Sequence, residues 1–312
     1  MLEQYIENWH NSINTVEIGN SSSKTIKIGG ENSLPFLYKE GSLYNRTIIA
    51  HEIWDITPID WPELLTKELN KVYTDPVKWA LYCKEELGAE VICLRLQGAH
   101  SDTKNRSADE SAKICKKVQD ATKLPLIILG CGEHSKDNEI LPICSQALKG
   151  NNCLFGSATQ EDYKTLVAAC IADNHNIIAE SPIDINIAKQ LNILISDTGL
   201  AANRIVMNPT VGALGYGLEY TYSIMERARL AALTGDKMLS MPFICFVGQE
   251  AWRTKEAKAT LKDFPDWGKE ELRGPLWEMI TASAFLQSGA DILVMRHPKS
   301  ILETKKLIDK LT

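Results

Sequence analysis

Several patterns that mark common protein classes are missing from this chain of 312 residues. No run of 18 apolar residues occurs, which predicts that the chain has no membrane-spanning helix. No two of its eight cysteines form a C-x-x-C pair, so the short thiolate spacings of zinc and iron–sulfur sites are missing. The formal charge of −6 offers no excess of lysine and arginine for binding a duplex. We therefore expect neither a membrane anchor nor a nucleic-acid partner.

Sequence motifs of self-contained catalytic sites are also missing. The chain has no phosphate-binding G-x-x-x-x-G-K-[ST] loop and no G-x-S-x-G elbow. His51-Glu52 begins like a zinc-protease motif, but Asp55 stands where the second histidine belongs, and the segment reads as a strand rather than a helix. The six histidines show no metal-ligand spacing. The sequence thus predicts no metal site and no complete catalytic set.

The cysteines and the first residues indicate the compartment. Several cysteines lie inside apolar runs, which predicts buried, reduced thiols, and Cys131 stands apart because it occupies a Gly-Cys-Gly turn. Residues 1–4 are polar and acidic, so no signal peptide is expected. A reducing cytoplasm fits both observations.

The first 46 residues differ from the rest in their hydrophobic pattern. Residues 15–19 and 25–30 alternate apolar and polar side chains, and a polar Asn-Ser-Ser-Ser segment separates them. This pattern predicts a β-hairpin that caps one end of the fold. We therefore divide the chain into an N-terminal extension, residues 1–46, and a main domain, residues 47–312.

The main domain alternates short apolar runs with amphipathic stretches. Continuous apolar runs are typical of parallel strands that are buried on both faces. Eight such runs occur, at residues 47–53, 91–96, 125–129, 152–155, 176–179, 204–207, 243–247 and 291–295. Helical periodicity predicts helices at residues 76–87, 108–121, 138–148, 161–172, 184–196, 217–233, 272–287 and 299–311.

Eight strands that alternate with eight helices predict a closed (β/α)8 TIM barrel. Several predicted helices end at a glycine, namely Gly88, Gly150, Gly199, Gly235 and Gly289. Asp184 and Ser300 are plausible helix-start residues. The alternative is a doubly wound open sheet, but the glycine-rich turn expected after its first strand is replaced by His51-Glu52-Ile53-Trp54-Asp55.

In such a barrel the loops after the strands form the functional surface. These loops are polar and rich in glycine, and among their residues are Glu52, Asp55, Gln97, Gly98, His100, Gly130, Cys131, Gly132, Gly156, Ser157, Glu180, Ser181, Asn208, Thr210, Gly248, Gln249, Glu250, Arg296 and His297. Neutral hydrogen-bonding groups and small residues there suit a bound ligand. Glu180 and Glu250 could pair as carboxylates, and His297 is either a general acid or, the favoured reading, a helix-start residue.

The longest of these loops, residues 208–217, holds Gly212, Gly215 and Gly217 before a predicted helix. It could cradle a phosphate at the helix N-terminus, form a lid, or expose backbone to a large flat ligand. Turn geometry alone would also explain the glycines. Tyr216 in this loop and Trp252 in another are aromatic residues on the functional face, where contacts with a flat ligand or a partner are common.

Five segments resemble the small (delta) subunit of the corrinoid iron–sulfur protein of the anaerobic acetyl-CoA synthase/CO dehydrogenase system. The resemblance extends from about residue 25 to the C-terminus, and its clearest segments are residues 181–192, 212–220, 223–227, 235–242 and 250–253. It implies a TIM barrel that pairs with a large (gamma) subunit. That large subunit carries a [4Fe–4S] cluster, and a cobamide lies between the two subunits.

The resemblance also implies that the pair accepts a methyl group from a methyltetrahydrofolate:corrinoid methyltransferase and passes it to acetyl-CoA synthase. The chain lacks the D-x-H-x-x-G corrinoid signature, because Ile178 stands where the glycine is required. A small subunit needs neither that signature nor a cluster of cysteines.

We therefore predict that the strand-end loops cover one face of the corrin, with few fixed charges near the cobalt. The expected cofactor-binding residues are Asn208, Thr210, Tyr216 and Trp252 first, then Ser157, Ser181, Gly212 and Gln249. Two alternatives remain: an autonomous, pterin-dependent methyltransferase that binds methyltetrahydrofolate itself, and a structural partner that never meets the cofactor.

Overall fold

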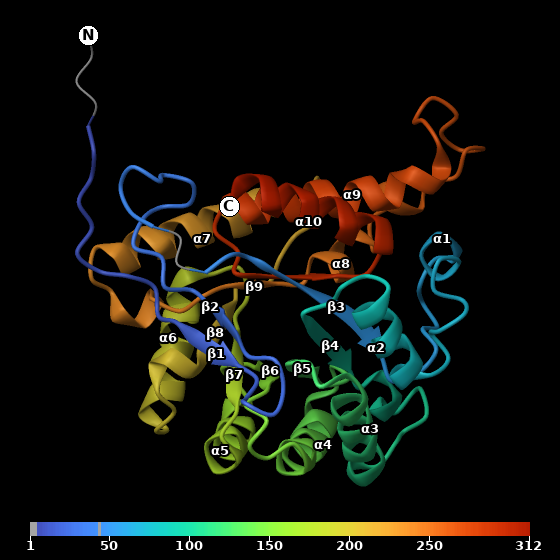
Figure 1. Ribbon diagram of the computed structural model, residues 1–312, viewed down its shortest axis with the longest axis horizontal. Helices are drawn as coiled ribbons and strands as arrows, with labels where there is room; N and C mark the ends of the chain where they lie inside the picture. Colours follow the sequence, from blue (N-terminus) through green and yellow to red (C-terminus); the bar gives the residue numbers. More distant parts are fainter. Residues whose placement is uncertain (1–4, 43–44) are drawn as a thin grey trace.

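The computed structural model describes residues 5–42 and 45–312, and a ring of parallel strands lies at its centre (Figure 1). The neighbour order along the sheet is β8-β7-β6-β5-β4-β3-β10-β9. A parallel bridge between Met207 and Phe243 joins the two edges, where the Met207 amide donates to the Pro242 carbonyl at 2.8 Å. The strands are β3 (Ile48–Trp54), β4 (Val91–Arg95), β5 (Leu126–Leu129), β6 (Leu154–Ala158), β7 (Asn176–Glu180), β8 (Ile205–Asn208), β9 (Ile244–Cys245) and β10 (Ile292–Met295).

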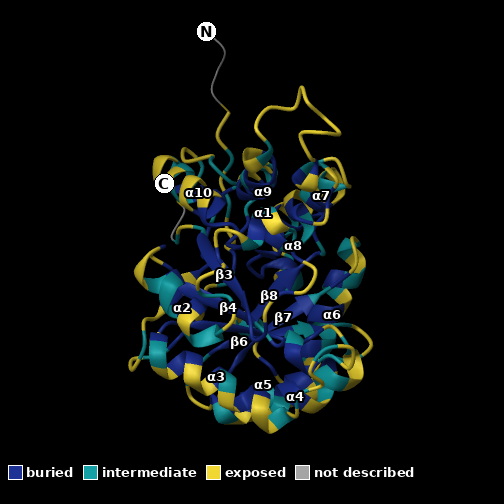
Figure 2. Cartoon of the chain, turned by 90° about the vertical axis from the view of Figure 1, so that its right-hand side faces the viewer, coloured by how far each residue is buried: buried dark blue, intermediate teal, exposed yellow. Residues whose placement is uncertain are grey.

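Helices surround this ring, and their outward faces are exposed while the strands are buried (Figure 2). The α-helices are α1 (Glu63–Thr66), α2 (Pro76–Glu85), α3 (Ala108–Thr122), α4 (His134–Ala147), α5 (Tyr163–Asp173), α6 (Ile185–Asp197), α7 (Leu218–Leu233), α8 (Val247–Ala251), α9 (Glu270–Gln287) and α10 (Pro298–Leu311). Short 3₁₀ helices are η1 (Gln97–Ala99), η2 (Ala202–Arg204), η3 (Lys237–Leu239) and η4 (Glu256–Lys258). The predicted TIM barrel is therefore confirmed.

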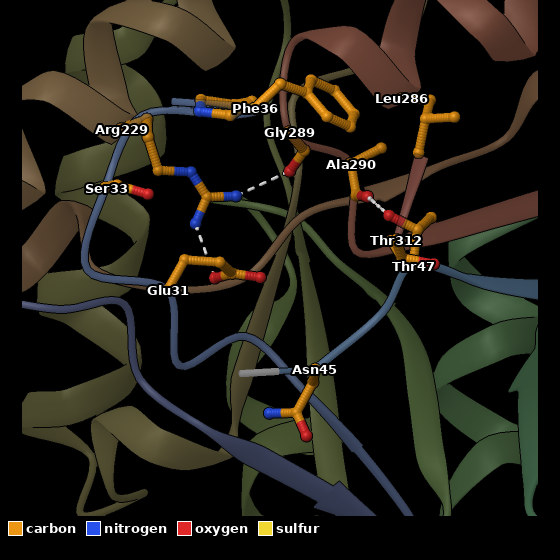
Figure 3. Close-up of a pocket in the computed structure, with 11 residues that line it drawn as sticks. Glu31, Ser33, Phe36, Asn45, Thr47, Arg229, Leu286, Gly289, Ala290 and Thr312 are labelled. Carbon is orange, nitrogen blue, oxygen red and sulfur yellow. Dashed lines mark hydrogen bonds and ion pairs between the residues drawn. The ribbon is translucent and has the colours of Figure 1, made fainter. Parts of the chain in front are cut away.

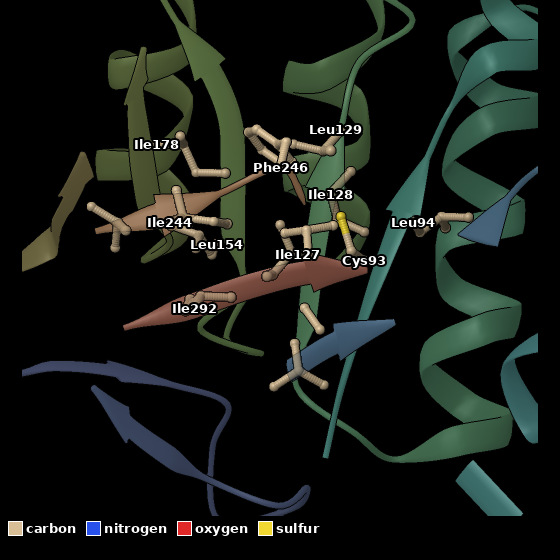
Figure 4. Close-up of a cluster of buried hydrophobic side chains, with 14 of the residues drawn as sticks. Cys93, Leu94, Ile127, Ile128, Leu129, Leu154, Ile178, Ile244, Phe246 and Ile292 are labelled. Atoms are coloured by element: carbon tan, nitrogen blue, oxygen red, sulfur yellow. The ribbon is translucent and has the colours of Figure 1, made fainter. Parts of the chain in front are cut away.

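The core follows from the continuous apolar runs. All seven residues of β3 are buried, and so are all four of β5, β8 and β10. Figure 4 shows buried side chains of several barrel strands meeting in one cluster, among them Ile127, Leu154 and Ile292. Parallel strands carry side chains on both faces, so the barrel interior and the helix-facing side are both filled.

An antiparallel hairpin covers the amino ends of the strands, as the alternating pattern predicted. It consists of β1 (Val16–Ile18) and β2 (Ile26–Ile28), whose alternate apolar side chains are buried. The side chains of Asn152 and Asn176, at the starts of β6 and β7, donate to the Glu17 carbonyl at 2.7 and 2.8 Å. The hairpin thus closes this end and leaves the opposite end for a ligand.

A buried arginine fastens the segment after the hairpin to the barrel (Figure 3). Arg229 of α7 contacts Glu31 at 3.0 Å and Asp291 at 3.4 Å, and it donates to the Gly289 carbonyl at 2.6 Å. The cavity beside it holds only about 30 Å³. We call Glu31, Arg229 and Asp291 the lower cluster.

Some predicted boundaries are wrong in detail. The expected strand at residues 243–247 is reduced to β9, because Val247 already begins α8. Ser157, expected in a loop, lies within β6. Asp184 is the N-cap of α6, as predicted, but α10 is capped by His297 instead of Ser300, since the His297 ring accepts from the Lys299 amide at 3.1 Å.

Other predictions concern the cysteines and the ends of the chain. All eight cysteines are free and buried, as expected. Across residues 5–42 and 45–312, no helix is long and apolar enough to cross a membrane. Residues 1–4, used above to predict the lack of a signal peptide, lie outside the described residues. The division of the chain after residue 46 stays a prediction.

Candidate functional site

A large cavity opens among the carboxyl ends of the barrel strands. Its volume is about 690 Å³, within the range of small-molecule sites. It is lined by residues that follow or end almost every strand, among them Trp54, Trp61, Arg95, Gln97, His100, Cys131, Ser157, Glu180, Asn208, Thr210, Phe246, Gln249, Glu250, Trp252, Arg253, Lys258 and Arg296. The loops after the strands therefore enclose one site, as the barrel predicts.

A buried ion cluster lies on one wall of this cavity. Glu52 of β3 accepts from Arg95 at 2.9 Å and from two nitrogens of Arg296 at 2.8 Å each. These residues end three adjacent strands, β4, β3 and β10, so the barrel register brings them together. The indole of Trp54 donates to the same carboxylate at 3.0 Å. We call Glu52, Arg95 and Arg296 the upper cluster.

Aromatic rings cover the faces of the two guanidinium groups. The guanidinium carbon of Arg296 lies 4.6 Å from the ring centroid of Trp61 and 5.8 Å from that of Trp54. That of Arg95 lies 5.9 Å from the ring centroid of Phe246. Cation–π contacts of this kind stabilise a cation that has lost part of its water shell.

The upper cluster keeps Glu52 ionised despite its burial. Burial alone would raise the pKa of Glu52, but the charges of Arg296 and Arg95 outweigh this effect and hold the pKa well below its usual range. Burial would likewise lower the pKa of Arg95, yet the charge of Glu52 raises it. The cluster therefore contributes one negative and two positive charges at any physiological pH.

A second buried carboxylate holds Trp252 in place. Glu278 of α9 accepts from the Trp252 indole at 2.9 Å and from the backbone amides of Arg296 and His297 at 2.6 and 3.2 Å. The Trp252 ring also stacks on His297, with centroids 5.6 Å apart. Trp252 is only 3% exposed, so its edge reaches the cavity while most of the ring packs inside the protein.

The structure brings five of the eight predicted cofactor-binding residues to the cavity. These five are Ser157, Asn208, Thr210, Gln249 and Trp252. The other three, Ser181, Gly212 and Tyr216, are not among its lining residues. Whether any of the eight contacts a cofactor stays a prediction.

Hydrogen bonds shape the turn that follows β8. The Asn208 side-chain oxygen accepts from the Thr210 amide at 3.1 Å, and the Thr210 hydroxyl donates to the Ser181 carbonyl at 2.6 Å. Gly212 packs so closely that an added Cβ would lie 2.6 Å from the Tyr216 carbonyl oxygen. Gly217 has a φ of +89° at the N-cap of α7. Turn geometry therefore explains these two glycines without a phosphate.

Tyr216 and Ser181 have different surroundings from the cavity residues. Tyr216 is about half exposed, and its hydroxyl donates to Glu256 at 3.0 Å, which links two loops outside the cavity. Ser181 is buried, and its hydroxyl has no hydrogen-bond partner within residues 5–42 and 45–312.

The expected scarcity of fixed charges around the site is wrong. Besides Arg95 and Arg296 of the upper cluster, the cavity is lined by Asp60, Asp137, Glu180, Glu250, Arg253 and Lys258. The residues predicted from the sequence to line the strand ends included Glu52 and Arg296 but not Arg95. The signal for Arg95 was present in the sequence, because a charged residue ends the otherwise apolar run Val91–Arg95.

Cys131 and His297, the strand-end thiol and histidine singled out in the sequence, are not activated for catalysis. Burial raises the pKa of the Cys131 thiol to about 12, so the thiol stays protonated. Burial lowers the pKa of His297 to about 4, and its ring serves as the cap of α10, which confirms the helix-start reading. Within the described part of the chain, no group of three or more His, Cys, Asp and Glu residues is placed to hold a metal ion.

Comparison with known proteins identifies the family. A family model described as "CO dehydrogenase/acetyl-CoA synthase delta subunit" matches residues 15–308. The chain belongs to this family. Its relatives include acetyl-CoA decarbonylase/synthase complex subunit delta 2 of Methanosarcina acetivorans, which is 33% identical over 98% of this chain and 72% of the relative. Subunit delta of Methanocaldococcus jannaschii is 33% identical over 99% of this chain and 76% of its own. The resemblance found in the sequence is thereby confirmed.

Solved structures support the same fold. Dihydropteroate synthase of Xanthomonas albilineans with 4-aminobenzoic acid has a TM-score of 0.55 and 12% identity, and the match covers 89% of this chain and 96% of that one. The enzyme of Thermus thermophilus has a TM-score of 0.52 and 12% identity, with 89% and 98% covered. At this identity the likeness concerns the TIM barrel alone.

Proposed function

We propose that this delta-family chain is the small subunit of a corrinoid iron–sulfur methyl carrier and that its open barrel end covers a cobamide held by a large subunit. The carrier would receive a methyl group from a methyltetrahydrofolate:corrinoid methyltransferase and deliver it to acetyl-CoA synthase. The observation that carries the proposal is a large polar cavity at the open barrel end of a member of this family, where the Cys131 thiol stays protonated and no group of three or more His, Cys, Asp and Glu residues among the described residues is placed to hold a metal ion.

The lining residues fit a corrin in their hydrogen-bonding chemistry. A corrin is a flat macrocycle whose edge carries many amide groups, which need neutral donors and acceptors. The Ser157 hydroxyl and the Asn208 side-chain amine both belong to cavity-lining residues. Neither group makes a hydrogen bond within residues 5–42 and 45–312, since Asn208 bonds only through its oxygen. Both are therefore free to bind the corrin edge.

The bound corrinoid would supply a cobalt that carries the methyl group, and the chain's own residues would control access to it. Hydrogen bonds hold the turn after β8 rigid, so Asn208 keeps its position when the partner docks. The Cys131 thiol, which lines the cavity, stays protonated, and burial disfavours the charged form of His297, so neither competes with the carrier chemistry. The [4Fe–4S] cluster would belong to the large subunit. Free thiols at all eight cysteines suit a reducing cytoplasm.

Co-expression with a corrinoid-binding large subunit tests this proposal. We expect a heterodimer that contains cobalt and iron, and we expect Asn208→Asp together with Ser157→Ala to reduce the cobalt retained per heterodimer. Asn208→Asp keeps the acceptor that caps the turn, so folding should survive. Tyr82→Phe, on α2 and not among the cavity-lining residues, is the control.

Two results would contradict the proposal. One is a heterodimer whose cobalt content is the same for the double variant and the wild type. The other is an isolated chain that binds methyltetrahydrofolate and transfers its methyl group unaided, which would favour the autonomous pterin-dependent methyltransferase instead.

A further inference from the structure

The upper cluster leaves hydrogen-bond donors unused on the cavity wall. Arg296 directs Nε and Nη2 to Glu52, and Arg95 directs Nε to Glu52 and Nη2 to the Gln249 side-chain oxygen at 2.8 Å. The remaining Nη1 groups of both arginines make no hydrogen bond within the described residues. They are also not among the buried unpartnered atoms, so they reach the open space of the cavity that both arginines line.

The charges around the two arginines do not balance locally. One carboxylate, Glu52, serves both guanidinium groups. Glu250 pairs with Arg253, and Asp137 accepts from the amides of Cys131 and Gly132, so neither is available to the pair.

Two carboxylates that line the cavity remain to be considered. Asp60 is exposed and makes no ion pair in the described chain, and Glu180 ends β7. The charge of Glu180 helps to raise the pKa of Arg95, but this effect is weaker than that of Glu52. Glu180 makes no ion pair within 4.0 Å in the described chain, and its strand β7 lies three places around the barrel from β4, which ends in Arg95. The Arg95–Arg296 side therefore has an excess of positive charge.

We infer that Arg95 and Arg296 form a binding subsite for an oxyanion, a carboxylate or a phosphate, inside the barrel cavity. Guanidinium groups bind such oxyanions through paired, charge-assisted hydrogen bonds. Arg296 is only 8% exposed, and Glu52 and two tryptophan rings hold it in position, so the subsite is preorganised. The rings of Trp54 and Phe246 line the space beside it, which suits a ligand with a flat or apolar body.

This subsite goes beyond the proposed role of covering a corrin, because it needs no partner subunit. The oxyanion has two conceivable sources: a free small molecule that enters the cavity, or an anionic group of the bound corrinoid. Both present the same chemistry to the arginines, and the experiment below separates them.

The test is a titration of the isolated full-length chain with inorganic phosphate and, separately, with acetate, at constant ionic strength set by chloride. Tryptophan fluorescence is a direct readout, because Trp54 and Trp61 pack on Arg296. We expect saturable binding that Arg95→Gln weakens at least about tenfold, since it removes one of the two charged donors that face the cavity. Arg95→Lys keeps the charge but loses the guanidinium geometry, so its affinity should lie between those of Arg95→Gln and the wild type.

Arg46→Gln is the matched control, because Arg46 lies at the other end of the barrel, where its exposed side chain pairs with Glu90 and Asp309. Its affinity for phosphate should stay within about twofold of the wild type, because an exposed ion pair contributes little. A fluorescence change no larger than that with chloride would overturn the inference, and so would equal affinities of Arg95→Gln and wild type. A thermal melt of each variant, compared with and without phosphate, separates lost binding from lost folding.

Repeating the titration on the corrinoid-loaded heterodimer identifies the source. Unchanged phosphate affinity there indicates a free small oxyanion, whereas competition by the loaded cofactor indicates an anionic group of the corrinoid. Either result supports the subsite, and a failure of the heterodimer to form leaves the result on the isolated chain intact.

Discussion

Two buried arginine clusters lie at opposite ends of the same barrel, and their ratios of positive to negative groups are opposite. The upper cluster has two arginines and one carboxylate, Glu52, and it borders a cavity of about 690 Å³. The lower cluster has one arginine, Arg229, and two carboxylates, and it borders a space of about 30 Å³. The surplus positive charge of the upper cluster lies next to an open cavity, so an anionic ligand can neutralise it. The surplus negative charge of the lower cluster lies in a closed space, so only a bound proton can neutralise it.

The two clusters therefore respond differently to pH. In the lower cluster, burial and the charge of Glu31 raise the pKa of Asp291 well above its usual range, although Arg229 opposes them. A proton on Asp291 can then relieve its repulsion with Glu31. Guanidinium groups do not lose their protons in proteins, so the upper cluster has no such release. The comparison indicates that the lower cluster is structural and that the upper cluster is suited to binding.

The largest expected effect comes from Glu52→Gln. This change leaves Arg95 and Arg296 adjacent and buried without their counter-charge, and such losses cost about 3–5 kcal/mol of unfolding free energy. Urea unfolding at pH 7 measures it. Glu180→Gln is the control, because Glu180 also ends a strand at the cavity but makes no ion pair in the described chain. Similar stability losses for both variants would show that the upper cluster does not stabilise the barrel.

Arg229→Met should destabilise the protein by a similar amount at neutral pH, and this effect should depend on pH. At neutral pH the two buried carboxylates lose their counter-charge, which we expect to cost about 3–5 kcal/mol, the usual range for a broken buried pair. The loss should shrink as the pH falls, because protonation of Asp291, whose pKa is raised, removes one of the two negative charges. The loss in Glu52→Gln should not shrink in this way. Unfolding free energies of the two variants between pH 5 and pH 8 test the difference, with the exposed Arg46→Met as control.

Asp291→Asn should change the free energy of unfolding least of the three variants. At high pH it should stabilise the protein, whereas the other two variants destabilise it. In the wild type, the Phe243 backbone amide donates to the Asp291 carboxylate at 2.7 Å. The asparagine side chain keeps an oxygen that can accept this bond, and it removes the charge that faces Glu31. When folding raises the pKa of a carboxyl, the protein loses stability as the pH rises. The loss begins near pH 4, the pKa of the carboxyl in the unfolded chain, and continues up to its pKa in the folded protein. The variant lacks this loss, so its stability relative to the wild type should improve with rising pH. A relative stability that falls with rising pH would contradict this assignment.

Much of the architecture could be predicted because it depends on residues near one another in the chain. Gly88, Gly150, Gly199, Gly235 and Gly289, expected at helix ends, all have positive φ values. Asp184 caps α6 through hydrogen bonds to amides two and three residues away. These features are local, so the sequence pattern alone indicates them.

The candidate site was predicted less well because its contacts join distant parts of the chain. Arg95 meets a carboxylate 43 positions earlier, and Arg296 meets the same group across 244 positions. Trp252 looked like a surface aromatic, yet Glu278 and close packing against Gly274 bury most of its ring. No local sequence pattern indicates these distant contacts.

The sequence by itself determined the barrel, the hairpin and the family, because apolar periodicity and extended similarity are properties of linear segments. Only the tertiary structure decided which strand-end residues share a cavity and which charges oppose one another there. The physical reason is that a side chain's hydrogen bonds, ion pairs and loss of water depend on neighbours supplied by other strands. Barrel closure through the Met207–Phe243 bridge is what places Asn208 of β8 around the same cavity as Arg95 and Arg296.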